Sequence, residues 1–145
     1  MSIKDCYINI EKKMSNLQSI SLLAARLIVA YGFWTPAWKK FGNIDAVASW
    51  FATLGIPFPL INAYLSASTE ILGVILLTLG LMTRLISIPL IVIMLVAIFT
   101  VHLPNGFHAA ENGFEIPLYY MLFLSLFLSF GAGKISVDHF LFKKQ

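Results

Sequence analysis

Four long runs of apolar residues alternate with short polar segments along the chain. The runs are Ser21–Trp38, Leu60–Met82, Leu85–Leu103 and Phe114–Gly133. A helix needs about 20 apolar residues to cross a hydrocarbon core about 30 Å thick, and each run is close to that length. The second and third runs are joined only through "LMTRL", which predicts a tight hairpin. We therefore expect an all-α membrane protein, an antiparallel bundle of four transmembrane helices.

The segment between the first two runs has a helical pattern of its own. In "NIDAVASWFATLG", an apolar stripe alternates with a polar face. Asn43 is a suitable N-cap residue, and Gly55 is a suitable stop. The pattern predicts a short amphipathic helix in the first outer loop, lying on the membrane surface. A surface loop with a single helical turn is the alternative. The stripe consists of Ile44, Val47, Phe51 and Leu54.

Composition supports the lipid bilayer as the solvent of this chain. Of the 145 residues, 59% are hydrophobic and 12% are charged, with a mean hydropathy of +0.83. Charged residues usually make up about a quarter of a soluble domain. The net charge of +3 is dispersed, which predicts no nucleic-acid partner. The single cysteine, Cys6, excludes an internal disulfide or dithiol pair, and the mixed charges of the N-terminus predict no cleaved signal peptide.

Lysine and arginine residues outside the runs predict the orientation of the chain. Cytoplasmic termini would place seven of these residues inside and two outside, as the positive-inside rule requires. We therefore expect a multi-pass protein of the bacterial inner membrane with a cytoplasmic N-terminal segment (1–20), a transmembrane domain (21–133) and a cytoplasmic tail (134–145). The inner residues are Lys4, Lys12, Lys13, Arg84, Lys134, Lys143 and Lys144, and the outer ones are Lys39 and Lys40.

Two ionisable residues, Arg26 and Glu70, fall within the predicted spans. With 1.5 Å per helical residue, Arg26 lies about 9 Å from the cytoplasmic end of its helix and Glu70 about 15 Å from the outer end. Charges at such depth normally face the helix bundle and find partners. One interpretation is an Arg26–Glu70 pair that fixes the first helix against the second. The other is a polar pocket that binds a ligand head group or relays a proton.

The stretch "FTVHLPNGFHAAENGFEIPLYY" places two histidines and two glutamates where the third run ends, in the loop that follows, and where the fourth run begins. Imidazole and carboxylate groups bind zinc or copper, but His102 and His108 lack the spacing of a metal motif. We instead predict that His102 and Glu115 frame the outer mouth of a pocket with Glu70 at its floor, and that Glu111 and His108 lie on the loop. The third interpretation, after a metal site and the mouth of a pocket, is that this stretch is only the solvated end of a hairpin. His139 is interpreted as solvated surface.

Several motifs occur in the order found in one family. They are "GFWTPAWKKFG", "LGIPFP", "STEILGVILL" and "LGLMTRL", preceded by the arginine of the first span. Together they resemble the DoxX family of small bacterial membrane proteins over about Leu22 to Asp138. Within that family, "FTVHLPNGF" followed by "NGFEIPLYY" is most similar to the HvfX-type branch. That branch is associated with copper-responsive clusters that make a modified metal-binding peptide.

The resemblance and the residues leave three functions to compare. The first is an accessory inner-membrane protein of a redox or copper-responsive pathway, with a pocket for a small ligand or quinone. The second is the membrane subunit of an oxidoreductase such as a thiosulfate:quinone oxidoreductase. The third is a small transporter, which the charge asymmetry disfavours. No cofactor is evident in the sequence, although quinone and copper fit the resemblance. Expected partners are other membrane or periplasmic pathway proteins and further copies of the chain.

Overall fold

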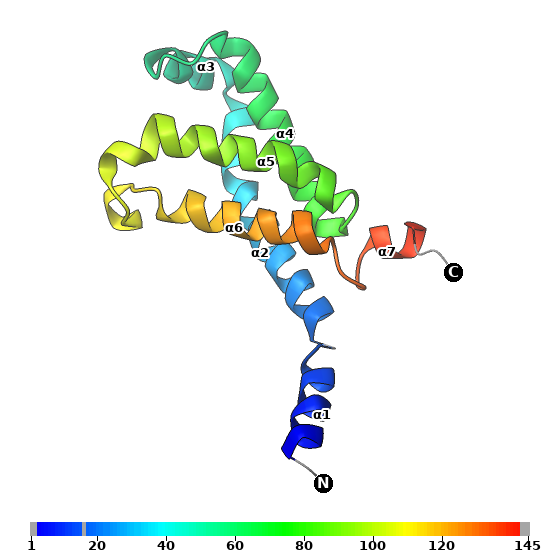
Figure 1. Ribbon diagram of the computed structural model, residues 1–145. Coiled ribbons are helices and arrows are strands. Elements are labelled where there is room, and N and C mark those ends of the chain that lie inside the picture. Colours follow the sequence, from blue (N-terminus) through cyan, green and yellow to red (C-terminus); the bar gives the residue numbers. More distant parts are fainter. Residues whose placement is uncertain (1–2, 16, 143–145) are drawn as a thin grey trace.

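The computed structural model describes residues 3–15 and 17–142, and this part of the chain is helical and contains no strand (Figure 1). The α-helices carry most of each predicted apolar run, and the helix over the first run ends at Gly42, four residues later than expected. The helices are α1 (Ile3–Ser15), α2 (Gln18–Gly42), α3 (Ile44–Thr53), α4 (Pro59–Leu79), α5 (Thr83–Ala97), α6 (Glu115–Phe130) and α7 (Val137–Phe142).

The predicted amphipathic helix is confirmed as α3, which joins α2 to α4. The Asn43 side chain accepts a hydrogen bond from the Ala46 amide at 3.3 Å, as an N-cap residue does. Phe51 is buried and the rest of the apolar stripe is half-buried, whereas Asp45 and Ser49 are exposed. Gly55 follows the helix with φ +73°, a conformation that glycine adopts without strain. The stripe packs α3 against α4.

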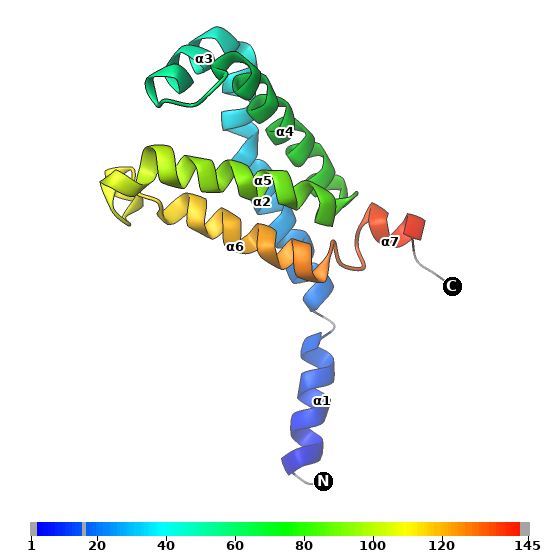
Figure 2. The same ribbon diagram turned by 45° about the horizontal axis from the view of Figure 1, so that its top comes forward.

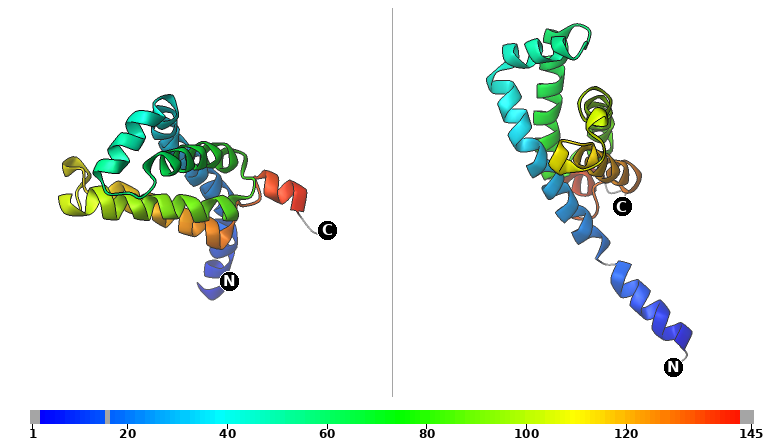
Figure 3. Two further views of the ribbon diagram at one scale, coloured as in Figure 1. Left: turned by 90° about the horizontal axis from the view of Figure 1, so that it is seen from above. Right: turned by 90° about the vertical axis from the view of Figure 1, so that its left-hand side faces the viewer.

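Two helical hairpins make up the body of the molecule, and they cross each other steeply. Helices α2 and α4 pack along each other, and so do α5 and α6. Figures 1 and 2 show the α5–α6 hairpin running across the α2–α4 hairpin, and the right-hand view of Figure 3 shows α5 and α6 end-on while α2 and α4 run lengthwise. An all-helical fold is thus confirmed, but the expected antiparallel bundle of four aligned helices is not confirmed.

Glycines allow close contact where the hairpins cross. A Cβ atom added at Gly73 of α4 would lie 2.8 Å from Leu90 Cδ1 of α5, and one added at Gly32 of α2 would collide with the Tyr120 hydroxyl of α6. Small residues at such contacts are characteristic of helices packed in membranes. The core at the crossing includes Phe33, Leu77 and other fully buried apolar side chains; the others are Val29, Ala30, Leu90, Leu124 and Phe127.

The outer surfaces of these helices remain strongly apolar. Large hydrophobic side chains on α2, α4, α5 and α6 are exposed, as a lipid environment requires. By length and composition, three helical stretches of the described chain are able to cross a membrane: Gln18–Gly42, Pro59–Leu79 and Thr83–Asn105. The last of these combines α5 with a π-helical turn, Ile98–His102, and a 3₁₀ turn, Leu103–Asn105. Helix α6 is apolar but shorter, with 16 residues.

The two ends of the described chain differ in how they meet the body. Figure 1 shows α1 projecting away from the hairpins, whereas α7 lies beside the turn between α4 and α5. The Asp138 amide donates a hydrogen bond to the Gly80 carbonyl at 3.0 Å, which fixes the start of α7 to that turn. The expected tail, 134–145, therefore begins with a docked segment; residues 143–145 lie outside the described part.

Candidate functional site

A buried carboxylate, Glu70, lies between α2 and α4 with a lysine as its partner. The Glu70 side chain is 2% exposed and the Lys40 side chain is 21% exposed. Lys40 Nζ lies 2.5 Å from Glu70 Oε1 and also donates to Ser66 Oγ at 3.1 Å. Ser66 is four residues before Glu70 on the same helix, so the two side chains share one face of α4. Lys40, Ser66 and Glu70 form what we call the Lys40–Glu70 cluster.

One polar atom of this cluster has no partner. Glu70 Oε2 is buried and makes no hydrogen bond in the described part of the chain. A buried carboxylate oxygen without a donor is costly, and such atoms are uncommon in native proteins. An added donor, such as a hydroxyl group of a ligand, would satisfy Oε2, while the ammonium group of Lys40 supplies a donor to a carbonyl or an anion.

The second buried charge, Arg26, lies at the opposite end of the α2–α4 hairpin. It is fully buried, and its guanidinium donates to the Leu77 carbonyl at 3.1 Å and to the Ile135 carbonyl at 2.7 Å. Gly80 leaves room for this group, because a Cβ atom there would collide with Arg26 Nη1. Arg26 thus joins the end of α4 and the segment before α7 to α2.

The expected Arg26–Glu70 pair is wrong, and the reason is the register of the two helices. Antiparallel packing places Arg26 opposite Leu77, and it places Lys40 opposite Ser66 and Glu70. Glu70 precedes Leu77 by seven residues, which is about 10 Å along a helix. The residue count from the ends of the apolar runs gives the depth of each charge in its helix, but it does not give the register of α2 against α4. It also assigned Lys40 to the loop, whereas α2 continues through Lys40 to Gly42.

Asp138 is a structural residue that the sequence analysis did not identify. Its carboxylate accepts hydrogen bonds from the amide of Met82, the N-cap residue of α5, at 2.7 Å and from that of Thr83, the first residue of α5, at 3.1 Å. These amides lack partners within the helix, so an acidic side chain there is stabilising. His139 is half-buried, and its amide donates to Ser136 Oγ at 3.2 Å. The expectation that this residue is solvated surface therefore holds only in part.

His102 and Glu115 are both used to build the loop after α5. His102 Nδ1 lies 2.8 Å from the Asn112 carbonyl oxygen. Glu115 Oε2 accepts from the Ala109 amide at 2.9 Å, and Glu115 Oε1 accepts from the Tyr119 hydroxyl at 3.1 Å. The polar contacts of both side chains therefore stay within this loop and the start of α6.

The predicted pocket between Glu70 and the His102–Glu115 pair stays a prediction. The hydrogen bonds of Glu70 run to α2, and Figure 1 shows the α5–α6 loop at the end of its hairpin that points away from the α4–α5 turn. His108 and Glu111 are exposed on the loop, as expected. Within residues 3–15 and 17–142, no three His, Cys, Asp or Glu side chains gather closely enough to hold a metal ion.

The apolar helices and the buried charges define a small helical membrane protein, and sequence comparison identifies its family. The DoxX family model matches residues 21–103, which is more than half of the chain. This chain belongs to the DoxX family. The match includes Arg26, Lys40, Ser66 and Glu70, and it ends before Glu115, the first residue of α6. It does not separate the HvfX-type branch from the rest of the family.

Three similar proteins cover most of the chain. Two are uncharacterized Haemophilus influenzae proteins: one is 30% identical over 94% of this chain and 89% of its own length, and the other is 34% identical over 90% of this chain and its whole length. A Bacillus subtilis protein named "Putative oxidoreductase CatD" is 28% identical over 90% of this chain and 93% of its own length. No solved structure matches the chain.

Proposed function

We propose that this protein is an accessory membrane protein of a redox pathway, and that its Lys40–Glu70 cluster binds the polar head of a small membrane-soluble ligand. The observation that carries the proposal is the buried carboxylate of Glu70, which has a cationic partner on one oxygen and no donor on the other. Ionisable side chains within apolar helices are costly and usually serve a function. The similarity to the Bacillus subtilis protein named as an oxidoreductase supports a redox context.

A quinone is the ligand class that fits these groups best. The ammonium of Lys40 donates to a quinone carbonyl, and Glu70 Oε2 accepts a hydrogen bond from a hydroxyl of the reduced form. An apolar ring and tail suit the lipid-facing helices around the cluster. Because the chain has one cysteine and no flavin or nucleotide motif, electrons would have to come from another subunit. The protein would thus hold the quinone for a membrane oxidoreductase, and another subunit would supply the electrons.

The copper-responsive role depends only on the resemblance to the HvfX-type branch. Growth under copper stress, with protein levels matched between the wild type and a deletion strain, tests it separately from quinone binding. Partner subunits and self-association are likewise part of the proposal, and crosslinking in membranes followed by mass spectrometry measures both.

Quinone binding is tested with the purified full chain in lipid nanodiscs and a decyl-tailed quinone, by isothermal titration calorimetry. Glu70→Gln and Lys40→Met should each weaken binding at least about tenfold, because each removes a charge-assisted hydrogen bond. Lys39→Met, which removes the adjacent exposed lysine, is the matched control and should bind as the wild type does. No binding by the wild type, or equal binding by all four proteins, would refute the proposal.

We also propose that the protein lies in the bacterial inner membrane with both termini in the cytoplasm. The bias of lysine and arginine residues toward one side supports this orientation. Asn105→Cys and Gln145→Cys, each made with Cys6→Ser, report on the two sides. An impermeant thiol reagent should label only the cysteine at position 105 in intact cells and both cysteines after lysis. Labelling of position 145 in intact cells would overturn the orientation.

A further inference from the structure

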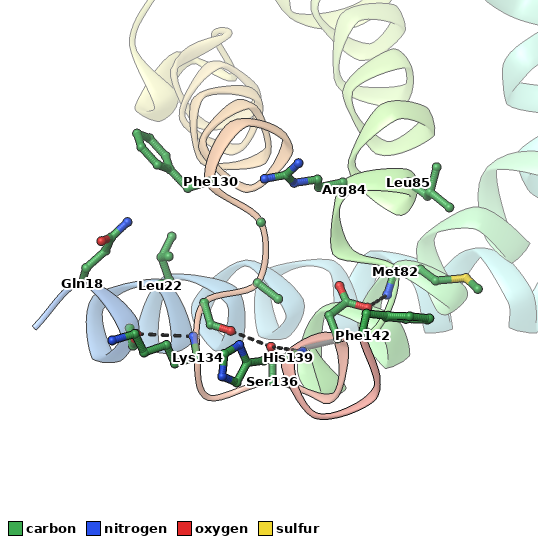
Figure 4. A pocket seen from close by; sticks show the side chains of 15 residues that line it. Gln18, Leu22, Met82, Arg84, Leu85, Phe130, Lys134, Ser136, His139 and Phe142 are labelled. Atoms are coloured by element: carbon green, nitrogen blue, oxygen red, sulfur yellow. Dashed lines mark hydrogen bonds between the residues drawn. The ribbon is translucent and has the colours of Figure 1, made fainter. Parts of the chain in front are cut away.

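A cavity of about 710 Å³ opens where α2 and α5 begin and α6 ends. Its walls come from the first turn of α2, the turn before α5, the connection after α6, and α7 (Figure 4). In a membrane protein, helix ends that gather in this way lie near the boundary between lipid and water. The cavity is at the opposite end of the α2–α4 hairpin from the Lys40–Glu70 cluster, so it is a different site.

Cationic side chains line this cavity, and the one carboxylate among its lining residues is already engaged. Arg84, Lys134 and His139 contribute the basic groups. The carboxylate is that of Asp138, whose two oxygens accept from the amides of Met82 and Thr83 at the N-terminus of α5. Figure 4 shows Arg84 beside the end of α6 and Lys134 on the other side of the cavity, near the start of α2. Within the described chain, neither Arg84 nor Lys134 forms an ion pair.

Arg84 is held in place by the end of α6. Its guanidinium donates to the Ser129 carbonyl at 3.1 Å. Gly131, with φ +76°, follows the last residue of α6, and a Cβ atom there would lie 3.3 Å from Arg84 Nε. The side chain therefore lies close against the backbone of the turn. One hydrogen bond to a carbonyl uses only part of the five donors of a guanidinium, so donors remain for an anion.

Apolar residues continue from the cavity onto the lipid-facing surface. Leu85 and Phe130 line the cavity and are 63% and 58% exposed, and Met82 is also exposed beside them. Basic groups at the boundary with apolar surface directly beside them match a ligand with an anionic head and a hydrocarbon tail. A free phosphate ion would gain nothing from Leu85 or Phe130.

We propose that this cavity binds the head group of an anionic phospholipid. Arg84 and Lys134 contact the phosphate from opposite sides, and the acyl chains run over Leu85 and Phe130 toward α5 and α6. Basic pockets between transmembrane helices on the cytoplasmic side bind anionic head groups in this manner. The bound lipid would tie the start of α5 to the segment before α7, so occupancy would stabilise the docked tail.

The test uses the purified full chain in a neutral detergent, with native mass spectrometry to measure lipid binding. Phosphatidylglycerol should bind more tightly than phosphatidylcholine with the same acyl chains. Near a membrane surface each basic residue contributes about 1 kcal/mol to anionic-lipid binding, which corresponds to about a fivefold change in affinity. Arg84→Gln and Lys134→Gln should each weaken phosphatidylglycerol binding by about that factor, and the double variant by roughly 25-fold.

Two variants control for charge and for folding. Lys39→Gln removes an exposed cation at the other end of α2 and should leave phosphatidylglycerol binding unchanged. Arg84→Lys keeps the charge and should retain most of the binding even if it loosens the contact with Ser129. Equal binding of the two lipids, or unchanged binding by the double variant, would overturn the proposal. Displacement of the lipid by millimolar inorganic phosphate would show a free-anion site instead, and would overturn it as well.

Discussion

Lys40 and Glu70, thirty residues apart in the chain, form an ion pair between α2 and α4 with 2.5 Å between Nζ and Oε1. The two partners are buried to different extents: the Glu70 side chain is 2% exposed, whereas the Lys40 side chain is 21% exposed. A long lysine side chain near a helix end is able to extend its ammonium group toward water. Glu70 lies near the middle of α4, and its shorter side chain does not bring the carboxylate to water. Substitutions of Lys40 and of Glu70 should therefore lower the free energy of unfolding by different amounts.

Lys40→Met should destabilise the protein more than Glu70→Gln does. The first leaves a buried carboxylate without its cation, and breaking a buried pair in this way costs about 3–5 kcal/mol. The second leaves a lysine that reaches solvent, so the cost should be about 1–2 kcal/mol, that of a weakened hydrogen bond. The double variant Lys40→Met/Glu70→Gln should recover much of the loss. Thermal unfolding in detergent measures all three, and strictly additive losses would show that the pair does not act as a unit.

Arg26→Met should release the segment before α7. The guanidinium of Arg26 holds the Ile135 carbonyl at 2.7 Å, and a hydrogen bond to a charged group contributes about 1.5–3 kcal/mol. Losing it should speed tryptic cleavage after the exposed Lys134 by at least about tenfold. Cleavage after Lys40, within α2, is the internal reference for global unfolding. If cleavage at both positions rises equally, Arg26 supports the whole fold and does not specifically retain the tail.

Asp138→Ala should remove the cap of α5. The two amides that it leaves without partners lie at Met82 and Thr83, and loss of a helix cap costs about 0.5–2 kcal/mol. Asp138→Asn keeps one oxygen acceptor and should lose less. Glu11→Ala removes an exposed carboxylate from α1 and serves as the control, with unfolding temperature unchanged. An unfolding temperature for Asp138→Ala equal to that of the control would contradict a capping role.

Gly80→Ala should be among the most damaging small substitutions in the chain. Gly80 has φ +67°, where other residues are strained by about 1–3 kcal/mol. The added Cβ atom would also collide with the guanidinium of Arg26 and lie 2.7 Å from Ser136 Cβ. Gly42→Ala is the matched control, because nothing lies within 4 Å of a Cβ atom there. The free energy of unfolding should fall for the first substitution and change little for the second.

The sequence predicted the helices well because each element has a local cause. Periodic apolar runs define the long helices, and the Asn43 cap and Gly55 stop bound α3. The partners of the buried charges depend on how α2 and α4 slide against each other, which no local pattern encodes. The apolar run ends at Trp38, which places Lys40 in the loop, whereas α2 continues to Gly42. The depth count brings Arg26 near Glu70, whereas the acceptors of Arg26 are backbone carbonyls.

Local sequence patterns also do not predict the crossing of the two hairpins or the docking of the tail. The crossing depends on close contacts such as that of Gly73 with Leu90. The sequence around a glycine within a helix does not indicate which residue of another helix packs against it. Asp138 lies in the predicted cytoplasmic tail, yet it caps a helix that begins more than fifty residues earlier. The available indication in the sequence was the glycine pair Gly131 and Gly133, which marks a turn before a segment whose only acidic residue is Asp138.

Glu115→Ala should loosen the loop between α5 and α6. Glu115 accepts from the Ala109 amide and the Tyr119 hydroxyl, so its removal leaves that amide open to water. Hydrogen exchange at Ala109 should speed up at least about fivefold, the effect of losing one hydrogen bond of about 1 kcal/mol. His102→Ala should likewise loosen the loop at Asn112, whose carbonyl loses its imidazole partner.

Glu111→Ala and His108→Ala separate this structural role from a metal site in the same loop. Both side chains are exposed, and neither donates to nor accepts from another residue of the described chain. If the loop is held by Glu115 and His102 alone, these two variants should exchange as the wild type does, with or without added copper or zinc. A metal site would instead show slower exchange when copper or zinc is added to the wild type. That protection would disappear in His108→Ala as fully as in His102→Ala, which would assign the loop to metal binding.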